Sequence, residues 1–363
     1  MTKVISAFIL SALLSTFATL WVIYFSRKFR LFDNQDIYRK THVKLVSRLG
    51  GVAIFFGYFI ITHLYADLNS ISIHSVVAAS SIIFFLGLKD DLLGGAFPYE
   101  KFTVQLLASC IIVIFNSENF KLDLLSSDVM FISWLLEFFL PVCLLLFIIN
   151  AFNFIDGIDG LAGVLGVFVN VFIGTYLFNW GDEEFGISAF IIAGSTAGFL
   201  IYNLVPGKVF MGDSGAMLIG LMTGVLCLRF VNLSLSHNEV RFSSPVLIVC
   251  SLLIVPTFDV LRIFIIRAIH RKPLLTGDRN HIHHRLQDLG VRDLHAVLIL
   301  IIFTAISLGV AIIGQAEGSV TIIFVLLLLC LLSNTVLSYF RGRRLVGSYK
   351  LSDVLFIDTF NRR

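Results

Sequence analysis

The sequence predicts an all-α polytopic integral membrane protein. Its 363 residues are 57% hydrophobic and only 14% charged, and its mean hydropathy is +0.92. Soluble domains are nearer half apolar and a quarter charged. The chain also repeats apolar runs of about 20 residues, the length of a helix that crosses a bilayer. Because the polar segments between these runs are too short to fold alone, we expect one integral-membrane domain over residues 1–363.

Eleven apolar segments are candidates for transmembrane helices. They cover residues 4–25, 49–66, 73–88, 102–116, 130–150, 161–179, 187–204, 215–231, 245–266, 295–314 and 319–339. The third and fourth segments are short. The first is too long for the apolar core of a signal peptide and has no small-residue cleavage site before Arg27, so we expect it to remain as a span.

Lysine and arginine are distributed unevenly between the two sets of loops. With eleven spans, 23 of the 27 basic residues fall on the side of segment 26–48 and the C-terminal tail. The exceptions are Lys3, Lys121, Arg229 and Arg241. Cytoplasmic loops of membrane proteins carry the excess of basic residues. We therefore expect the N-terminus outside and the C-terminus in the cytoplasm.

Five polar clusters lie on the expected cytoplasmic side, whereas the opposite loops read as short solvated connections. The clusters are Ser47–Gly51, Lys89–Gly95, Asn150–Gly163, Asn203–Gly215 and Asp278–Arg285. This distribution predicts one active site on the cytoplasmic face, with a ligand that comes at least partly from the cytosol. The net charge of +3 is small and does not indicate nucleic-acid binding.

The segment Asn150–Gly163 is the centre of the expected site, because Asp156 and Asp159 lie there between two long apolar runs. Carboxylates in such a place are costly unless they meet a cation, a polar ligand or water. On a helix, a spacing of three residues puts both on one face. Gly160 and Gly163 allow either a second helix or a ligand to approach closely.

Asp90 and Asp91 follow an apolar run and precede the turn residues Gly94 and Gly95. Adjacent carboxylates raise one another's pKa unless a cation lies beside them. The pair is therefore consistent with Mg²⁺ and a phosphorylated ligand, with a general base, or with a hydrated helix end.

The sequence Phe-Met-Gly-Asp-Ser-Gly at 210–215 precedes the eighth apolar run. A helix start of this kind presents backbone N–H groups that favour an anion, and Asp213 could also cap the helix. Mg²⁺ usually takes one or two protein carboxylates and completes its shell with water and substrate phosphates. The chain offers more aspartates than one ion needs, so some of them are expected to contact or orient the substrate.

His281, His283 and His284 lie in an expected loop with Arg279 and Arg285. The spacing fits no usual zinc site, and no cysteine is near. Histidine and arginine together suit phosphate oxygens, although a basic loop that holds lipid head groups has the same composition. His42, in the first loop, is equally consistent with a site residue and with a solvated one.

Taken together, these motifs resemble the polyprenyl-phosphate N-acetylhexosamine-1-phosphate transferases. The resemblance covers nearly the whole chain, with five motifs in the family's order. The Asn-x-x-Asn-x-x-Asp-Gly-x-Asp-Gly-Leu-Ala block at 150–162 and the motif at 210–215 are specific. His-Ile-His-His at 281–284 favours the UDP-GlcNAc branch over the phospho-MurNAc-pentapeptide transferase of peptidoglycan synthesis. Ser47 stands where that branch often has proline before Arg48, which affects the expected sugar recognition by that loop.

The resemblance implies that a UDP-HexNAc and undecaprenyl phosphate give undecaprenyl-diphospho-HexNAc and UMP, with Mg²⁺ as cofactor and Mn²⁺ as an alternative. UDP-GlcNAc is the expected donor, and UDP-GalNAc, UDP-QuiNAc and UDP-FucNAc are the alternatives. This reaction is the first membrane step of cell-surface glycan pathways such as enterobacterial common antigen, lipopolysaccharide O-antigen or teichoic acid linkage units. It also implies a multi-pass protein of the bacterial cytoplasmic (inner) membrane. A homodimer is compatible with these features.

The family's motifs assign roles to individual residues. By this resemblance, Asp213 and Asp91 hold the metal, Phe210 stacks on uracil, and Asp90 and Asp91 face the diphosphate and the lipid phosphate. The implied catalytic set is Asp90, Asp91, Asp156, Asp159, His281, His283 and His284. The implied substrate-binding set is Asn153, Asp159, Asn203, Phe210, Arg279, Arg48 and His42.

The lipid phosphate itself limits the role of a base. A phosphate monoester has a second pKa of about 6, so it is largely a dianion near neutral pH. We therefore expect Asp90 mainly to orient the nucleophile. Two other classes remain as alternatives: a cation-coupled transporter, which would place its carboxylates near the midplane in two repeats, and a non-catalytic lipid-binding scaffold.

Overall fold

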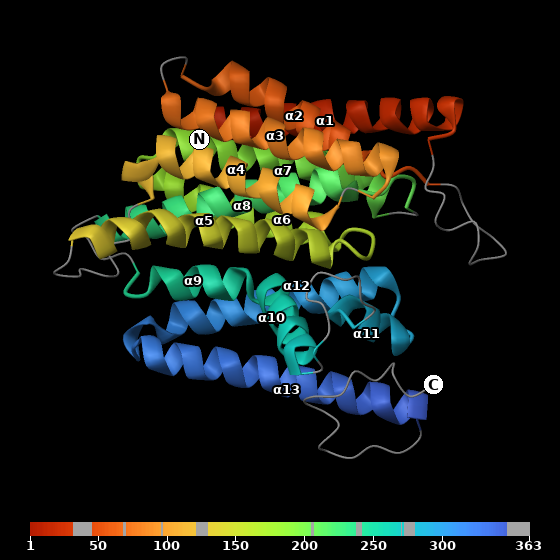
Figure 1. Cartoon of the computed structure of the whole chain (residues 1–363), viewed down its shortest axis with the longest axis vertical. Helices are drawn as coiled ribbons and strands as arrows, with labels where there is room; N and C mark the ends of the chain where they lie inside the picture. The colour runs from red at the N-terminus through yellow and green to blue at the C-terminus, as the bar shows by residue number, and fades with distance from the viewer. Residues whose placement is uncertain are drawn as a thin grey trace. The chain divides into compact units, whose positions relative to one another are not determined.

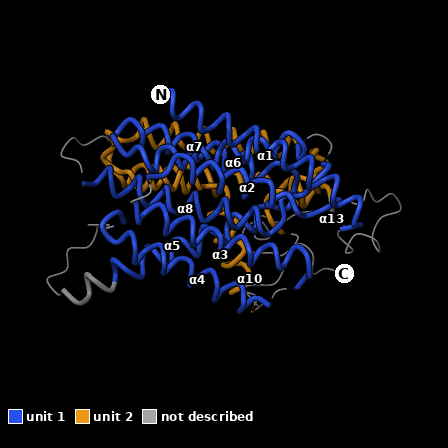
Figure 2. The backbone as a smooth tube through the Cα atoms, turned by 90° about the horizontal axis from the view of Figure 1, so that it is seen from above, with its two compact units in different colours: residues 1–238 blue, residues 239–363 orange. Residues whose placement is uncertain are grey.

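The computed structural model describes residues 1–31, 46–67, 70–95, 97–120, 130–204, 207–236, 242–269, 271 and 280–346. The chain divides into two compact units, Met1–Asn238 and Glu239–Arg363, which are coloured separately in Figure 2. We describe each unit by itself. That one domain comprises residues 1–363 stays a prediction.

The described residues of unit 1 form a bundle of eight helices (Figure 1). They are α1 (Thr2–Phe29), α2 (Gly50–Tyr65), α3 (Ile71–Leu93), α4 (Pro98–Phe115), α5 (Met130–Ile155), α6 (Leu161–Asn179), α7 (Glu183–Asn203) and α8 (Gly212–Ser236). A 3₁₀ turn, η2, covers Ser117–Asn119.

The helix α8 forms the core of unit 1. It packs against α2, α3, α5, α6 and α7, and 94% of its most apolar 18-residue stretch is buried. Small residues permit this packing: a Cβ on Gly220 would lie 2.9 Å from the Cα of Ile149 in α5. Because α8 is surrounded, its first residues, which include Asp213, meet the ends of several neighbouring helices.

The two sides of helix α1 differ in residue size, with small residues on the buried side and large residues on the exposed side. Its buried residues are small, including Ser11 and Ser15, and it packs on α7. There a Cβ on Gly198 would lie 2.2 Å from the carbonyl oxygen of Ala12. Its exposed residues include Phe17 and Trp21, as expected for a side that faces lipid.

Unit 2 contains the remaining helices. They are α9 (Pro245–Leu252), α10 (Ile254–Ile269), α11 (Ile282–Asp288), α12 (Asp293–Ile313) and α13 (Ser319–Val346), with a 3₁₀ turn, η3 (Gly314–Ala316). α12 packs against α9, α10, α11 and α13.

All eleven expected spans are helical, but they differ in length from the prediction. Among the described residues, nine helices are long and apolar enough to cross a membrane, whereas α2 is shorter. α3 and α4, expected to be short, have 23 and 18 residues. The chain is therefore a multi-pass membrane protein, and the total of eleven spans stays a prediction.

The expected ninth span is not one straight helix. α9 and α10 are bent by 76° relative to each other. Pro256 is the third residue of α10 and cannot donate a hydrogen bond to the carbonyl of Leu252, while its ring collides with that carbonyl in a continuous helix. The bend carries α10 away from the direction of α9.

Candidate active site

Two of the predicted motifs meet through their backbones. Ser47 and Val209 form an isolated parallel bridge, in which the N–H of Phe210 donates to the carbonyl of Ser47 at 2.8 Å. The N–H groups of Gly50 and Gly51 donate to the carbonyls of Phe210 and Met211 at 2.9 and 2.8 Å. The polar cluster of the first loop is therefore fixed directly beside the start of α8.

Asp91, in the last turn of α3, caps the N-terminus of α8. Its carboxylate accepts hydrogen bonds from the N–H of Asp213 at 2.8 Å, the N–H of Ser214 at 3.1 Å and the hydroxyl of Ser214 at 2.6 Å. First-turn N–H groups have no partner within their own helix, and a helix N-terminus favours negative charge. We predicted that these groups favour an anion, and in this structure the anion is Asp91.

Glycines allow this close approach. A Cβ on Gly87 of α3 would lie 2.4 Å from the Cα of Ser214, and a Cβ on Gly51 of α2 would lie 2.2 Å from the backbone nitrogen of Gly215. Both contacts are with backbone that cannot move aside without shifting α8. The space between α2, α3 and α8 therefore requires glycine at both positions.

Lys101, in the first turns of α4, connects a predicted catalytic aspartate, Asp90, with the predicted metal ligand Asp213. Its Nζ lies 2.8 Å from Oδ2 of Asp90 and 2.6 Å from Oδ2 of Asp213. Asn153, near the end of α5, donates from Nδ2 to the same oxygen of Asp213 at 3.3 Å. Sequence analysis did not select Lys101, although a lysine at the start of an apolar helix, shortly after an acidic pair, is a usable signal.

A polar contact supports the cluster from within the bundle. Gln105 of α4 is 1% exposed and accepts a hydrogen bond from Nδ2 of Asn150 in α5 at 2.8 Å. One helical turn separates Gln105 from Lys101, and Asn150 precedes Asn153 by three residues. The contact fixes α4 and α5 relative to each other where both supply side chains to Asp213.

Asp156 and Asp159 lie in a turn, and the expectation that a helix carries both on one face is wrong. α5 ends at Ile155 and α6 begins at Leu161. Gly160, the residue before α6, has φ 87°, a left-handed conformation that glycine adopts readily and that interrupts a helix. The two carboxylates therefore belong to a turn between two helices, and binding residues often lie in such connecting segments.

Burial raises the pKa of Asp156 well above its usual value, and the nearby charges of Asp213, Asp159 and Asp91 raise it further. The positive charge of Arg48 opposes this shift. Arg48, Asp91, Asp159 and Asp213 therefore each lie close enough to Asp156 to act on its charge. A cation that enters this group would favour the ionised form of Asp156.

Asp159 lies beside the segment that leads into α8. Asn203, at the end of α7, donates from Nδ2 to Oδ1 of Asp159 at 3.3 Å and to the carbonyl of Val209 at 2.9 Å. A Cβ on Gly207 would lie 2.2 Å from Oδ2 of Asp159. Phe210, which the resemblance assigns to uracil, is half-buried in this segment. Three of the residues expected to bind the nucleoside are thus neighbours.

The expected loop of histidines begins a short helix. His281 precedes α11, and His283 and His284 lie within it, so the expectation of a loop at these residues is wrong. His283 is 1% exposed, and neither of its ring nitrogens has a hydrogen-bond partner within the described residues. Burial, followed by the charge of His284, lowers the pKa of His283 to about 3, so this ring is neutral. His42 and Arg279 lie outside the described residues.

The pair of carboxylates of Asp90 and Asp213 in unit 1 fits a magnesium ion. Within the described part of the chain, no three His, Cys, Asp or Glu side chains are grouped closely enough to hold a metal by themselves. Mg²⁺ does not need three, because water and phosphate oxygens complete its shell. Asp90 and Asp213 already enclose a cation with carboxylate oxygens, namely the ammonium of Lys101.

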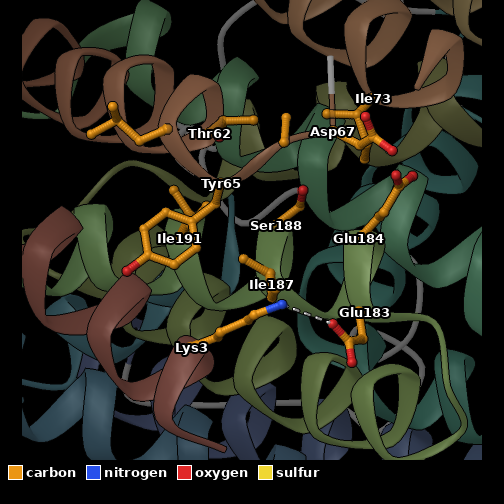
Figure 3. A pocket seen from close by; sticks show the side chains of 12 residues that line it. Lys3, Thr62, Tyr65, Asp67, Ile73, Glu183, Glu184, Ile187, Ser188 and Ile191 are labelled. Atoms are coloured by element: carbon orange, nitrogen blue, oxygen red, sulfur yellow. Dashed lines mark ion pairs between the residues drawn. The ribbon is translucent and has the colours of Figure 1, made fainter. Parts of the chain in front are cut away.

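A separate cavity of about 460 Å³ lies where α1, α3 and α7 begin and α2 ends (Figure 3). Its lining includes Lys3, Tyr65 and Glu183, with an ion pair of 3.6 Å between Lys3 and Glu183. Asp90 and Asp91 lie at the opposite end of α3. None of the predicted site residues that the structure describes lines this cavity.

Comparison with known proteins gives consistent matches. The family model described as "Glycosyl transferase family 4" matches residues 73–231. The chain is 31% identical over 312 residues to the probable undecaprenyl-phosphate N-acetylglucosaminyl 1-phosphate transferase of Bacillus subtilis, covering 83% of this chain and 82% of that protein.

Two further relatives have related names. The decaprenyl-phosphate N-acetylglucosaminephosphotransferase of Mycolicibacterium smegmatis is 30% identical over 82% of this chain and 78% of its own length. The undecaprenyl-phosphate alpha-N-acetylglucosaminyl 1-phosphate transferase of Escherichia coli is 27% identical over 86% of this chain and 83% of its own.

Proposed function

Because the chain belongs to the polyprenyl-phosphate N-acetylhexosamine-1-phosphate transferases, we propose that it transfers GlcNAc-1-phosphate from UDP-GlcNAc to undecaprenyl phosphate. The products are undecaprenyl-diphospho-GlcNAc and UMP. The observation that carries this proposal is the group of Asp90, Lys101, Asn153 and Asp213, which four helices bring together around one ammonium. Such a group can bind both a cation and phosphate oxygens.

The reaction requires charge neutralisation more than proton removal. An oxygen of the lipid phosphate attacks the β-phosphorus of the UDP-sugar, the bond from that phosphorus to the bridging oxygen breaks, and the bridging oxygen leaves with UMP. The nucleophile is largely a dianion near neutral pH, since its second pKa is about 6. Catalysis then depends on in-line positioning and on stabilisation of charge at the phosphoryl oxygens.

Asp213, with Asp90, would hold the Mg²⁺ ion that the family implies. When bound, this ion would neutralise charge on the diphosphate. Lys101 would then contact phosphate oxygens, because its ammonium already lies 2.6 Å from Asp213. Both oxygens of Asp91 accept hydrogen bonds from α8, which supports a structural role, and its role as a metal ligand stays a prediction.

The remaining residues of the cluster support a nucleotide role. Asp159, Asn203 and Phe210 would hold the uridine, and the close contact of Gly207 with Asp159 leaves that segment little freedom. Arg48 would balance the carboxylates beside Asp156. His281 and His284 would donate hydrogen bonds to phosphate oxygens. These assignments follow the motifs.

The distribution of basic residues supports the proposed orientation. The N-terminus would lie outside and the C-terminus inside a bacterial cytoplasmic membrane. The ends of helices that carry Asp90, Asn153 and Asp213 would then face the cytosol, where UDP-sugars occur, at the depth of the lipid phosphate. The cavity beside Lys3 would lie at the outer surface.

The proposed function is tested with the purified protein. UMP release is measured with undecaprenyl phosphate and a panel of UDP-GlcNAc, UDP-GalNAc and UDP-MurNAc-pentapeptide, with Mg²⁺, with Mn²⁺ and with a chelator. We expect UMP and a lipid-linked product from UDP-GlcNAc, lost with the chelator and in Asp213→Asn. Release of UMP from none of the donors, or uptake of a solute without UMP release, would contradict the proposal.

A further inference from the structure

Asp259, a residue outside every predicted motif, lies against the histidines of unit 2. It belongs to α10 and is 0% exposed. Its Oδ2 lies 2.8 Å from Nδ1 of His281, while its Oδ1 accepts hydrogen bonds from the N–H of Ile282 at 3.0 Å and from Arg262 at 3.1 Å. A buried carboxylate is costly unless it is paired and hydrogen-bonded, and two of its three partners belong to the His-Ile-His-His sequence.

This arrangement determines which ring nitrogen carries a proton. An ionised carboxylate can only accept hydrogen bonds, so Nδ1 of His281 must donate to Asp259. The opposite nitrogen, Nε2, is then either a donor in the charged ring or an acceptor in the neutral one. Carboxylate–histidine pairs in enzymes use this contact to fix the tautomer and orientation of the ring and to stabilise its charged form.

Arg262, in the same helix as Asp259, and Arg341, in α13, hold the same segment. The guanidinium of Arg262 in α10 donates to Asp259 and to the carbonyl of Asn280. Arg341 in α13 donates to Oδ1 of Asn280 at 3.0 Å. Asn280 immediately precedes His281. The backbone before α11 is thus fixed on the side where Asp259 meets the ring.

The neighbouring ring of His283 limits the positions that His281 can adopt. The two rings are parallel to within 5°, with centroids 5.7 Å apart. Because His283 is buried and neutral, it adds no charge beside His281 and acts as a spacer. Asp259 and His283 together restrict the orientation of the His281 imidazole.

We propose that Asp259 is a positioning residue that acts through His281, presenting Nε2 of that ring as a hydrogen-bond donor to a phosphate oxygen. This inference rests on the proposed function. In this proposal Asp259 itself touches no substrate. Its contribution is to hold the ring and to supply the negative charge that balances the charged imidazole.

A double-mutant cycle separates this role from a merely structural one. The single variants Asp259→Asn and His281→Asn and their combination are assayed for UMP release from UDP-GlcNAc. We expect Asp259→Asn to lower kcat/KM by about 10- to 100-fold, the usual cost of losing such a partner. In the His281→Asn background, the same substitution should cost almost nothing further. Additive losses would overturn the proposal.

Asp182→Asn is the matched control. Asp182 is a part-buried carboxylate, with its side chain 8% exposed, and is also paired with an arginine, Arg229. It accepts a hydrogen bond from the N–H of Phe185 at the start of α7. Its contacts within the described residues include no predicted site residue. Its effect on activity should be small and should multiply with that of His281→Asn. If Asp182→Asn behaves like Asp259→Asn in the cycle, the coupling reflects general destabilisation and the proposal fails.

Asp259→Glu keeps the inference testable if Asp259→Asn does not fold. The glutamate retains the charge that Arg262 needs but displaces the carboxylate from Nδ1 of His281. We expect a folded protein with a reduced kcat and a nearly unchanged KM for UDP-GlcNAc, since orientation matters most in the transition state. Activity equal to wild type in this variant would overturn the inference. Absence of UMP release by the wild-type protein would instead reject the proposed function.

Discussion

The ammonium of Lys101 lies 2.6 Å from a carboxylate oxygen of Asp213, a residue 112 positions further along the chain. The same nitrogen lies 2.8 Å from Asp90, so one cation joins the start of α4, the end of α3 and the start of α8. The proposed magnesium site and the lysine therefore share an oxygen donor, and their occupancies should be linked.

We expect Lys101→Met to lower kcat by about 10² or more, because loss of one stabilising donor at a reacting oxyanion typically costs that much. The same substitution should lower the Mg²⁺ concentration that gives half-maximal activity, since the ammonium no longer competes for Asp213. UMP release across a Mg²⁺ titration measures both effects.

Lys89→Met is the control for Lys101→Met. Lys89 pairs with Glu100 at 2.7 Å on an exposed surface, where an ion pair contributes less than about 1 kcal/mol. The Lys89→Met variant should retain its activity and require the same Mg²⁺ concentration as the wild type. A higher Mg²⁺ requirement in Lys101→Met would mean that the ammonium supports the ion and would contradict competition.

Asp91→Asn should reduce the stability of the protein as well as its activity. The carboxylate satisfies two N–H groups at the start of α8 and the hydroxyl of Ser214. The amide that replaces it carries no charge and turns a donor toward one of them. We expect a loss of about 1–3 kcal/mol in the free energy of unfolding, measured by thermal unfolding in detergent.

Asp90→Asn separates the two neighbouring carboxylates. Asp90 contacts the side chain of Lys101, whereas Asp91 contacts the backbone of α8. Asp90→Asn should therefore reduce activity with a much smaller change in melting temperature. Equal destabilisation by both variants would show that capping is not what distinguishes Asp91.

Much of this architecture can be predicted from the sequence, because apolar length and polar clusters are local properties. All eleven apolar segments are helices, and the clusters at Asp90, Asn150–Asp159 and Asp213 do meet. The turn at Asp156 could not be predicted by spacing alone, since three residues fit a helix and a turn equally well. The left-handed Gly160 decides between them.

Two residues escaped sequence analysis for a different reason. Lys101 and Asp259 each lie in an apolar helix without a motif. Their importance depends on contacts with Asp213 and His281, which lie 112 and 22 positions further along the chain. Only the folded structure brings such partners together. The capping role of Asp91 was hidden in the same way, because a carboxylate pair reads as metal or base until its hydrogen-bond donors are known.

Gly87→Ala should destabilise unit 1 strongly. The added Cβ would lie 2.4 Å from the Cα and 2.5 Å from the backbone nitrogen of Ser214, so α8 must shift away from α3. Overpacking of this kind costs about 1–3 kcal/mol or more, and the shift also separates Asp91 from the α8 amides. Melting temperature and UMP release should therefore fall together.

Gly309→Ala is the matched substitution in a helix without a close neighbour. A Cβ at this position of α12 would meet nothing within 4 Å. Alanine is favoured over glycine inside a helix by roughly 0.5–1 kcal/mol, so stability should be unchanged or higher. If Gly87→Ala is tolerated as well as Gly309→Ala, the contact between α3 and α8 is looser than the structure indicates.

Asp156 makes stability depend on pH in a direction opposite to that of most carboxylates. In the unfolded chain it titrates near 3.8, and in the folded protein burial and three neighbouring carboxylates raise its pKa well above that value. Between the two values the folded state binds more protons than the unfolded state. The free energy of unfolding therefore falls as pH rises through this window.

Asp156→Asn removes this titration and tests the sign directly. Without divalent cations, the variant should be more stable than wild type at neutral pH, and its melting temperature should depend less on pH, while UMP release falls. Added Mg²⁺ should stabilise the wild type more than the variant, because a cation beside Asp156, Asp159 and Asp213 favours their ionised forms. The opposite result would be a melting temperature that rises with pH, and by the same amount in the wild type and in Asp156→Asn. Asp156 would then be ionised in the folded protein without a metal.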